Sequence, residues 1–157
     1  MYSIRSNRAT QPARRRRATR GLYALAIAAL LAMSAIAAPM ALAKGSKTVA
    51  GEATAPKLHK TVLTNTKGLT LYTLVGETHG KFICTTPTCL QAWPPLLVTP
   101  GTTPKGPVKL GTVKNPEGKT QVTFKGMPVY TFEGDSNKGE ANGEGLKDVG
   151  VWHAVTP

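Results

Sequence analysis

Arginine is absent from residues 44–157 of this 157-residue chain, although residues 1–43 hold seven Arg and no acidic residue. The formal charge of the whole chain is +12, but residues 44–157, with 13 Lys and eight acidic side chains, carry only +5. Arginine is the residue that most often makes the bidentate contacts to phosphate and guanine. Its absence, with Lys scattered along the chain, argues against specific nucleic-acid binding.

The same segment has only two Ser, two Cys and one Met, and it lacks the common catalytic signatures. It contains no Gly-x-Ser-x-Gly nucleophile elbow, no His-Glu-x-x-His helix and no phosphate-binding Gly-rich loop. Its three His, at positions 59, 79 and 153, are far apart and have no metal-ligand spacing. No Cys-x-x-Cys-His haem motif is present either. We therefore predict a non-catalytic protein with no cofactor.

Residues 1–43 have the organisation of an export signal. Five Arg between positions 14 and 20 form a basic region, and Leu22 to Ala38 follow as an uncharged apolar stretch of 17 residues. Ala41-Leu42-Ala43 then offers small residues at the positions that a signal peptidase reads. We predict cleavage before Lys44, so that the chain meets the membrane only through this segment before cleavage.

Two questions about export stay open. The 17-residue stretch reaches the lower limit for a spanning helix, so an uncleaved signal anchor is the alternative to cleavage. The Arg run also leaves both the general and the twin-arginine export routes open. Because no Cys lies near residue 44, we expect the exported protein to be extracellular or envelope-associated without a lipid anchor.

After the signal, the chain divides into a linker and two copies of one unit. Residues 44–57 are small and polar without periodicity, which predicts a flexible linker before a folded domain at 58–157. A shift of 58 positions aligns residues 67–77 with 125–135, and five of these 11 pairs are identical. We interpret the domain as two repeats. The first covers about 58–97 and the second about 108–157, with a connector rich in Pro, Thr and Gly at about 98–107.

Each repeat opens with the pattern of a β-hairpin. Apolar residues alternate with period two on both sides of Asn65-Thr66-Lys67-Gly68 in the first repeat and of Lys125-Gly126 in the second. A further turn at Asn115-Pro116-Glu117-Gly118 makes the second repeat a three-stranded meander. The predicted fold is mainly β, a small antiparallel β-domain built from two hairpin-containing repeats.

The two cysteines, Cys84 and Cys89, follow the first hairpin. An even number of cysteines in an exported chain predicts a disulfide, here closing a loop of six residues. Within the loop, Thr86-Pro87 has the pattern of a helix start. Pro94-Pro95, after the loop, has the pattern of a helix stop, so the sequence predicts one short helix between them. A redox-active or metal-binding pair is the alternative, but the four intervening residues do not match the usual two-residue spacing.

Several motifs occur in a fixed order across residues 60–156. They are Tyr130, Phe132 and Asp135 in the pattern Tyr-x-Phe-x-x-Asp; its looser copy at Tyr72, Leu74 and Glu77; the cysteine pair before Trp93-Pro94-Pro95-Leu96; and the closing segments Asn142-Gly143-Glu144-Gly145 and Val151-Trp152-His153. This set resembles a bacterial secreted or lipoprotein repeat family of unknown function with a conserved Tyr-x-aromatic-x-x-Asp motif. The resemblance implies an exported protein with no defining enzymatic activity. Leu74 departs from the aromatic of the motif, which suggests a packing role.

The acidic residues of the motif allow two interpretations. Asp135, and less tightly Glu77, could accept backbone N–H groups and close a turn, or the two could form a carboxylate pair between the repeats. The loop at 133–148 holds five of the eight acidic side chains of residues 44–157. Oxygen ligands of this kind suit calcium, although the Gly that an EF-hand loop needs is replaced by Glu at position 140. The candidate ligands are Asp135, Asn137, Glu140 and Glu144.

Four aromatic residues occupy equivalent positions in the two repeats: Tyr72, Tyr130, Trp93 and Trp152. We expect them to form a core that the repeats share, since large aromatic side chains are usually buried. A carbohydrate-binding platform is the alternative and would require exposed rings. The sequence as a whole predicts an exported binding or structural module, with anionic cell-envelope polymers as possible partners. A metal-binding or redox accessory protein, using the loop at 133–148 or the Cys84/Cys89 pair, is the alternative function.

Overall fold

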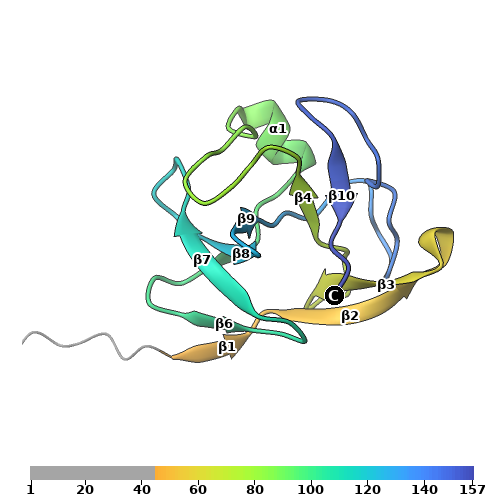
Figure 1. The fold of residues 1–157 in the computed structure, drawn as a ribbon, viewed down its shortest axis with the longest axis horizontal. Coiled ribbons are helices and arrows are strands. Elements are labelled where there is room, and N and C mark those ends of the chain that lie inside the picture. Colours follow the sequence, from red (N-terminus) through yellow and green to blue (C-terminus); the bar gives the residue numbers. More distant parts are fainter. Residues whose placement is uncertain (1–44) are drawn as a thin grey trace, which may run out of the picture. The chain divides into compact units, whose positions relative to one another are not determined.

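Short strands and turns make up residues 45–157, the part of the chain that the computed structural model describes (Figure 1). The predicted signal peptide lies outside these residues. In chain order the elements are β1 (Ser46–Thr48), β2 (Ala50–Ala55), the 3-10 helix η1 (Pro56–Leu58), β3 (Lys60–Asn65), β4 (Tyr72–Leu74), α1 (Pro87–Ala92), β5 (Leu97–Val98), β6 (Thr103–Lys105), β7 (Leu110–Lys114), β8 (Thr120–Phe124), β9 (Met127–Pro128) and β10 (Trp152–Ala154). The predicted mainly β fold with one short α-helix is confirmed. Within residues 45–157, no helix has the length and apolarity to span a membrane.

The second repeat contains the predicted meander. Strand β7 pairs antiparallel with β8, and β8 turns through Lys125-Gly126 into β9. Lys125 itself has a positive φ of 49°, as does Gly126 at 82°, which is the conformation that a tight two-residue hairpin requires. Strand β5, from the end of the first repeat, pairs antiparallel with β8, so the repeats already share this sheet.

The first repeat has the same outer strand, although the sequence did not reveal it. Strand β2 pairs antiparallel with β3, and the pair Gly51 and Thr64 corresponds to the pair Gly111 and Thr123 of β7 and β8. The prediction of a flexible linker over residues 44–57 is therefore wrong for β2. Small residues such as Ala50 carry little strand signal, but they are buried once β3 pairs with them. Strand β1 also lies in that range and pairs parallel with β6.

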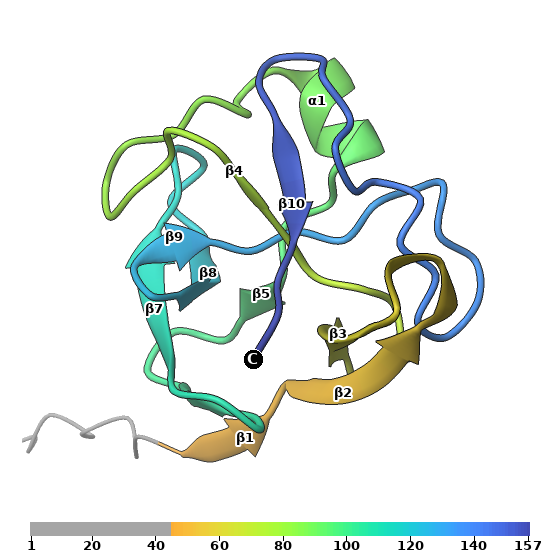
Figure 2. The same ribbon diagram turned by 45° about the vertical axis from the view of Figure 1, so that its right-hand side comes forward.

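Beyond the hairpins, each repeat supplies a segment to the other. Figure 2 shows β10, near the C-terminus, beside β4 of the first repeat, and the two strands pair antiparallel. At the end of β10, the Val155 N–H donates to the Leu71 carbonyl at 2.8 Å, and the Val155 carbonyl accepts from Leu63 N–H at 2.8 Å. Leu71 N–H donates to the Leu63 carbonyl at 2.8 Å, so Leu63, Leu71 and Val155 form a closed triangle of backbone hydrogen bonds. The second repeat thus inserts a strand end into the hairpin of the first.

The reverse insertion has the same hydrogen bonds. Val122 N–H donates to the Leu96 carbonyl at 2.9 Å, and Leu96 N–H donates to the Val129 carbonyl at 3.0 Å. Val129 N–H donates to the Val122 carbonyl at 3.1 Å. Leu96 follows the Trp93 of the first repeat as Val155 follows the Trp152 of the second, 59 positions later. Each repeat therefore completes the sheet of the other.

Three hydrophobic clusters result, and the two larger ones both draw on the two repeats. The residues of the two triangles, with Val49, Ala50, Phe124 and further apolar side chains, form one cluster. The aromatic residues of the motif form the other, together with the cysteine pair. Neighbouring residues Val129 and Tyr130 point into different clusters. This fits the period-two alternation that the sequence showed, with apolar side chains on both faces of the strand.

Candidate functional site

The motif tyrosines each donate to the motif acid of the other repeat. Tyr72 Oη donates to Asp135 Oδ2 at 2.6 Å, and Tyr130 Oη donates to Glu77 Oε2 at 2.9 Å. The backbones of the two tyrosines are also reciprocally bonded, with N–H to carbonyl distances of 2.8 Å and 3.0 Å. All four residues are buried. Each carboxylate is thus hydrogen-bonded to a tyrosine of the other repeat, and the hydrogen bonds of the described residues do not join the two carboxylates to each other.

Each acid also accepts backbone N–H groups from the loop that follows it. Asp135 Oδ1 accepts from Asn142 N–H at 2.9 Å. Glu77 Oε1 accepts from Ile83 N–H at 2.7 Å and from Cys84 N–H at 2.9 Å. The turn-closing role expected from the sequence corresponds to these bonds, but the loops they fix are longer than a single turn.

Burial shifts the pKa values of both tyrosines and of Asp135. Desolvation, reinforced by the neighbouring carboxylates, raises the pKa of both Tyr72 and Tyr130 well above the ordinary value, so the hydroxyls remain donors. Desolvation also raises the pKa of Asp135, although the hydrogen bonds from Tyr72 and from Asn142 N–H oppose the shift. The hydroxyl-carboxylate pairs are thus suited to cross-linking the repeats rather than to proton transfer with solvent.

The two tryptophans stack directly on each other. The ring centroids of Trp93 and Trp152 are 3.8 Å apart, with 10° between the ring planes. Both indole N–H groups donate to one carboxylate, that of Asp148, at 2.8 Å and 2.7 Å. Desolvation acts to raise the pKa of Asp148, but the two indoles and two backbone N–H groups stabilise its charge and leave the pKa below the ordinary value.

The aromatic residues form a core and not an exposed platform. Tyr72, Trp93, Tyr130 and Trp152 are all 0% exposed, so a carbohydrate-binding surface made of these rings is excluded. Phe132 stacks on Trp93 with centroids 4.4 Å apart, but it is only partly buried. Leu74, the residue at the equivalent position of the first repeat, is fully buried.

The disulfide between Cys84 and Cys89 is present, as predicted. Helix α1 begins at Pro87 inside this loop, and the Thr86 hydroxyl caps it by accepting from Cys89 N–H at 3.3 Å. A shift of 59 positions places Cys89 on Asp148. The position of the second cysteine is therefore occupied in the second repeat by the carboxylate that the two tryptophans share.

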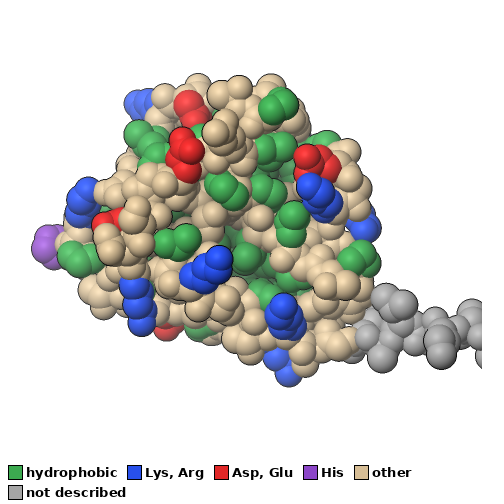
Figure 3. All heavy atoms as spheres, turned by 180° about the vertical axis from the view of Figure 1, so that it is seen from behind, with side chains coloured by type: hydrophobic (Ala, Val, Ile, Leu, Met, Phe, Trp, Pro, Cys, Tyr) green, Lys and Arg blue, Asp and Glu red, His purple; other side chains and the backbone are tan. Residues whose placement is uncertain are grey.

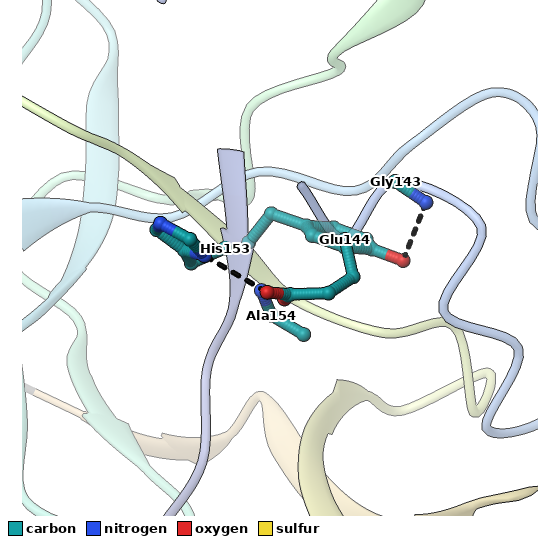
Figure 4. A network of polar contacts seen from close by, with 5 residues as sticks. Gly143, Glu144, His153 and Ala154 are labelled. Carbon is teal, nitrogen blue, oxygen red and sulfur yellow. Dashed lines mark hydrogen bonds and ion pairs between the residues drawn. The ribbon is translucent and has the colours of Figure 1, made fainter. Parts of the chain in front are cut away.

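The acidic loop does not gather its four candidate metal ligands. Asn137 Nδ2 donates to Glu140 Oε1 at 2.7 Å, which brings these two together. Asp135, by contrast, is bound to Tyr72. Glu144 accepts from Ala154 N–H at 2.6 Å and pairs with His153 Nδ1 at 2.8 Å (Figure 4). Within residues 45–157, no group of three or more His, Cys, Asp or Glu side chains could hold a metal ion.

Sequence reasoning missed Asp148, which lay in the acidic loop but was not among the candidates. The shift of 59 positions that relates Trp93 to Trp152 could have identified Asp148, because it aligns this acidic residue with Cys89. The pairing of each tyrosine with the acid of the other repeat had no signal in the sequence. It depends on how the two copies fit together.

One comparison with known proteins gives a match. Residues 111–156, which cover most of the second repeat, match the sequence model of a family described as a secreted repeat of unknown function. The resemblance noted in the sequence is thereby confirmed over this range. No curated protein and no solved structure is significantly similar to the chain.

Proposed function

From the match of its second repeat to a secreted repeat family, we propose that the protein is an exported, non-catalytic binding module that attaches to anionic polymers of the cell envelope. The side chains of the sequence motifs stabilise the interior of the protein. The motif tyrosines, their acids, both tryptophans and both cysteines contact one another across the repeats. We therefore look for the binding site on the surface of the protein.

The observation that carries this proposal is the imbalance of charge on that surface. Of the 12 Lys in the described residues 45–157, only Lys119 forms an ion pair, with Glu117 at 2.9 Å. Two carboxylates, those of Asp135 and Glu77, are buried and hydrogen-bonded to tyrosines. Figure 3 shows lysine side chains spread around one face, with fewer acidic ones among them. Such a surface attracts polyanions, and salt weakens the attraction.

The alternative of a metal-binding or redox accessory protein has less support. The Cys84/Cys89 pair is a disulfide that packs in the aromatic cluster. The acidic side chains of the loop at 133–148 have separate hydrogen-bond partners.

Binding to isolated cell walls tests the proposal. The exported protein, purified from the culture, is incubated with cell walls and sedimented at increasing salt concentrations. We expect it to sediment with the walls at low salt and to be released as salt rises, because the Debye length falls from about 30 Å at 0.01 M to about 10 Å at 0.1 M. Walls stripped of their anionic polymers should bind it poorly. Binding that is unchanged by salt or by stripping would refute the proposal.

A further inference from the structure

Two hollows on the surface lie beside the hairpin turns. The hollow of the second repeat has a volume of about 390 Å³, and its basic lining residues are His79, Lys109 and Lys125. The floor comes from β7 and β8, where Gly111 faces Thr123. No acidic residue lines this hollow.

The hollow of the first repeat has a volume of about 340 Å³. Its cationic lining residues are Lys67, in the hairpin turn, and Lys138. The floor comes from β2 and β3, where Gly51 faces Thr64. One acidic residue, Glu52, also lines this hollow, so its positive potential is weaker than that of the second.

The two hollows are built from equivalent parts. Each contains the Lys-Gly dipeptide of a hairpin turn, at 67–68 and at 125–126. Each also receives a basic residue from the other repeat: His79 reaches the turn of the second repeat, and Lys138, 59 positions later, reaches the turn of the first. The same reciprocal assembly that pairs the tyrosines with the acids therefore creates both hollows.

A glycine lies in the floor of each hollow. A Cβ atom at Gly111 would lie 2.8 Å from Thr123 Oγ1, closer than real Cβ atoms approach. Gly111 therefore allows β7 to pack closely against the buried Thr123, which is 2% exposed. At Gly51 the equivalent distance to Thr64 Oγ1 is 3.5 Å, an ordinary contact.

Two lysines flank the end of the strand pair at the second hollow. Leu110 and Phe124 are the last paired residues of β7 and β8, and Lys109 and Lys125 are the next residue outward on each side. The Lys125 ammonium lies 4.7 Å from the centroid of the Phe124 ring, which holds it near the strand end. Both lysines line the hollow, so an anion bound there would be attracted by both.

We propose that the two hollows are anion subsites, each taking one oxyanion group, phosphate or carboxylate, of the same polymer. This inference rests on the proposed function and assigns it a place on the molecule. The lysine ammonium groups would contact the anionic oxygens through charge-assisted hydrogen bonds, and the His79 ring could donate a further N–H. A polymer long enough to span both subsites would bind more tightly than separate anions, because its second contact is intramolecular.

Three charge-matched double variants of the exported protein test this. Lys109→Gln/Lys125→Gln alters the second hollow, Lys67→Gln/Lys138→Gln alters the first, and Lys60→Gln/Lys147→Gln removes the same charge from exposed positions that line neither hollow. Affinity is measured by calorimetry for inorganic polyphosphate and for polygalacturonate, at low salt. Thermal unfolding of each variant confirms that it is folded.

We expect the second-hollow variant to lose about tenfold or more in affinity, the first-hollow variant to lose less, and the control to change by less than about threefold. Competition between the two polymers would show that the subsites recognise oxyanions in general. Binding of only one polymer would show whether the subsites take phosphate or carboxylate. Equal losses in all three variants would overturn the subsites while leaving the proposed function intact. Failure of the wild-type protein to bind either polymer would overturn both.

A measurement on the wild-type protein makes the test independent of the variants. Nuclear magnetic resonance during titration with inorganic polyphosphate should shift the His79 ring and the amides of Thr64 and Thr123, which line the hollows. Binding without these shifts, or with shifts spread evenly over the surface lysines, would contradict the assignment.

Discussion

Each motif tyrosine has its acceptor in the other repeat, and this explains which substitutions the motif tolerates. The tyrosine is identical in both copies, since its hydroxyl must reach a carboxylate and its backbone must pair with the other tyrosine. The acid can be Asp135 or Glu77, because either carboxylate can accept a tyrosine hydroxyl and backbone N–H groups. The aromatic position tolerates Leu74, because its role there is to fill the buried cluster.

Tyr72→Phe should destabilise the protein by about 1 to 3 kcal/mol, because it leaves the buried Asp135 Oδ2 without its donor. Tyr130→Phe should have a similar effect through Glu77. Chemical denaturation of both variants measures the cost. Adding Asp135→Asn to Tyr72→Phe should cost less than the sum of the two single substitutions, since the residues interact directly. If both Tyr→Phe variants keep wild-type stability, the two tyrosine–carboxylate hydrogen bonds do not contribute to the free energy of unfolding.

Asp148 should make stability depend on acidic pH. Its pKa lies below the usual 3.8, so its stabilising contribution is present above about pH 3.8 and is lost as the pH falls through the lower folded-state value. Asp135, whose pKa is raised, acts in the opposite direction: its contribution is present below the usual value and is lost as the pH rises through the raised one.

Melting temperatures of the wild type and Asp148→Asn between pH 2 and pH 6 test this dependence. The variant should be less stable at pH 6, and its stability should fall less steeply as the solution is acidified. Parallel curves for the two proteins would show that the carboxylate of Asp148 does not stabilise the tryptophan stack.

The elements differed in how well the sequence predicted them. The hairpin around Lys125-Gly126 and helix α1 were predictable, since turn glycines, a capping threonine and prolines act locally. Strand β2 was not, because its Ala and Gly residues acquire a strand conformation only by pairing with β3. The disulfide followed from the cysteine count, whereas the shared contact of Asp148 with both tryptophans depends on tertiary packing.

Hydrogen exchange of the backbone amides can establish whether β2 is an integral strand. We expect amides of residues 50–55 that bond to β3 to exchange slowly, as part of the folded domain, with protection like that of the paired β7. The exposed turn at residues 79–80 provides a fast-exchanging comparison. Exchange over residues 50–55 as rapid as in that turn would restore the flexible linker expected from the sequence.

At the scale of the whole molecule, the two repeats form one structural unit. Strand ends cross in both directions, with Val155 bonded in the first hairpin and Leu96 in the second. Both larger hydrophobic clusters contain residues from the two repeats. A single repeat would expose its half of each cluster and leave its hairpin incomplete, and an isolated hairpin is at best marginally stable. The surface hollows depend on the same assembly, since each combines a turn from one repeat with a basic residue from the other.

Scanning calorimetry of the exported protein tests this interdependence most directly. If the repeats fold only together, heating should give a single transition whose calorimetric enthalpy equals the van't Hoff enthalpy. Tyr72→Phe should lower the temperature of that transition without splitting it, although the hydroxyl belongs to the first repeat and its acceptor to the second. Two separable transitions, one for each repeat, would contradict the account.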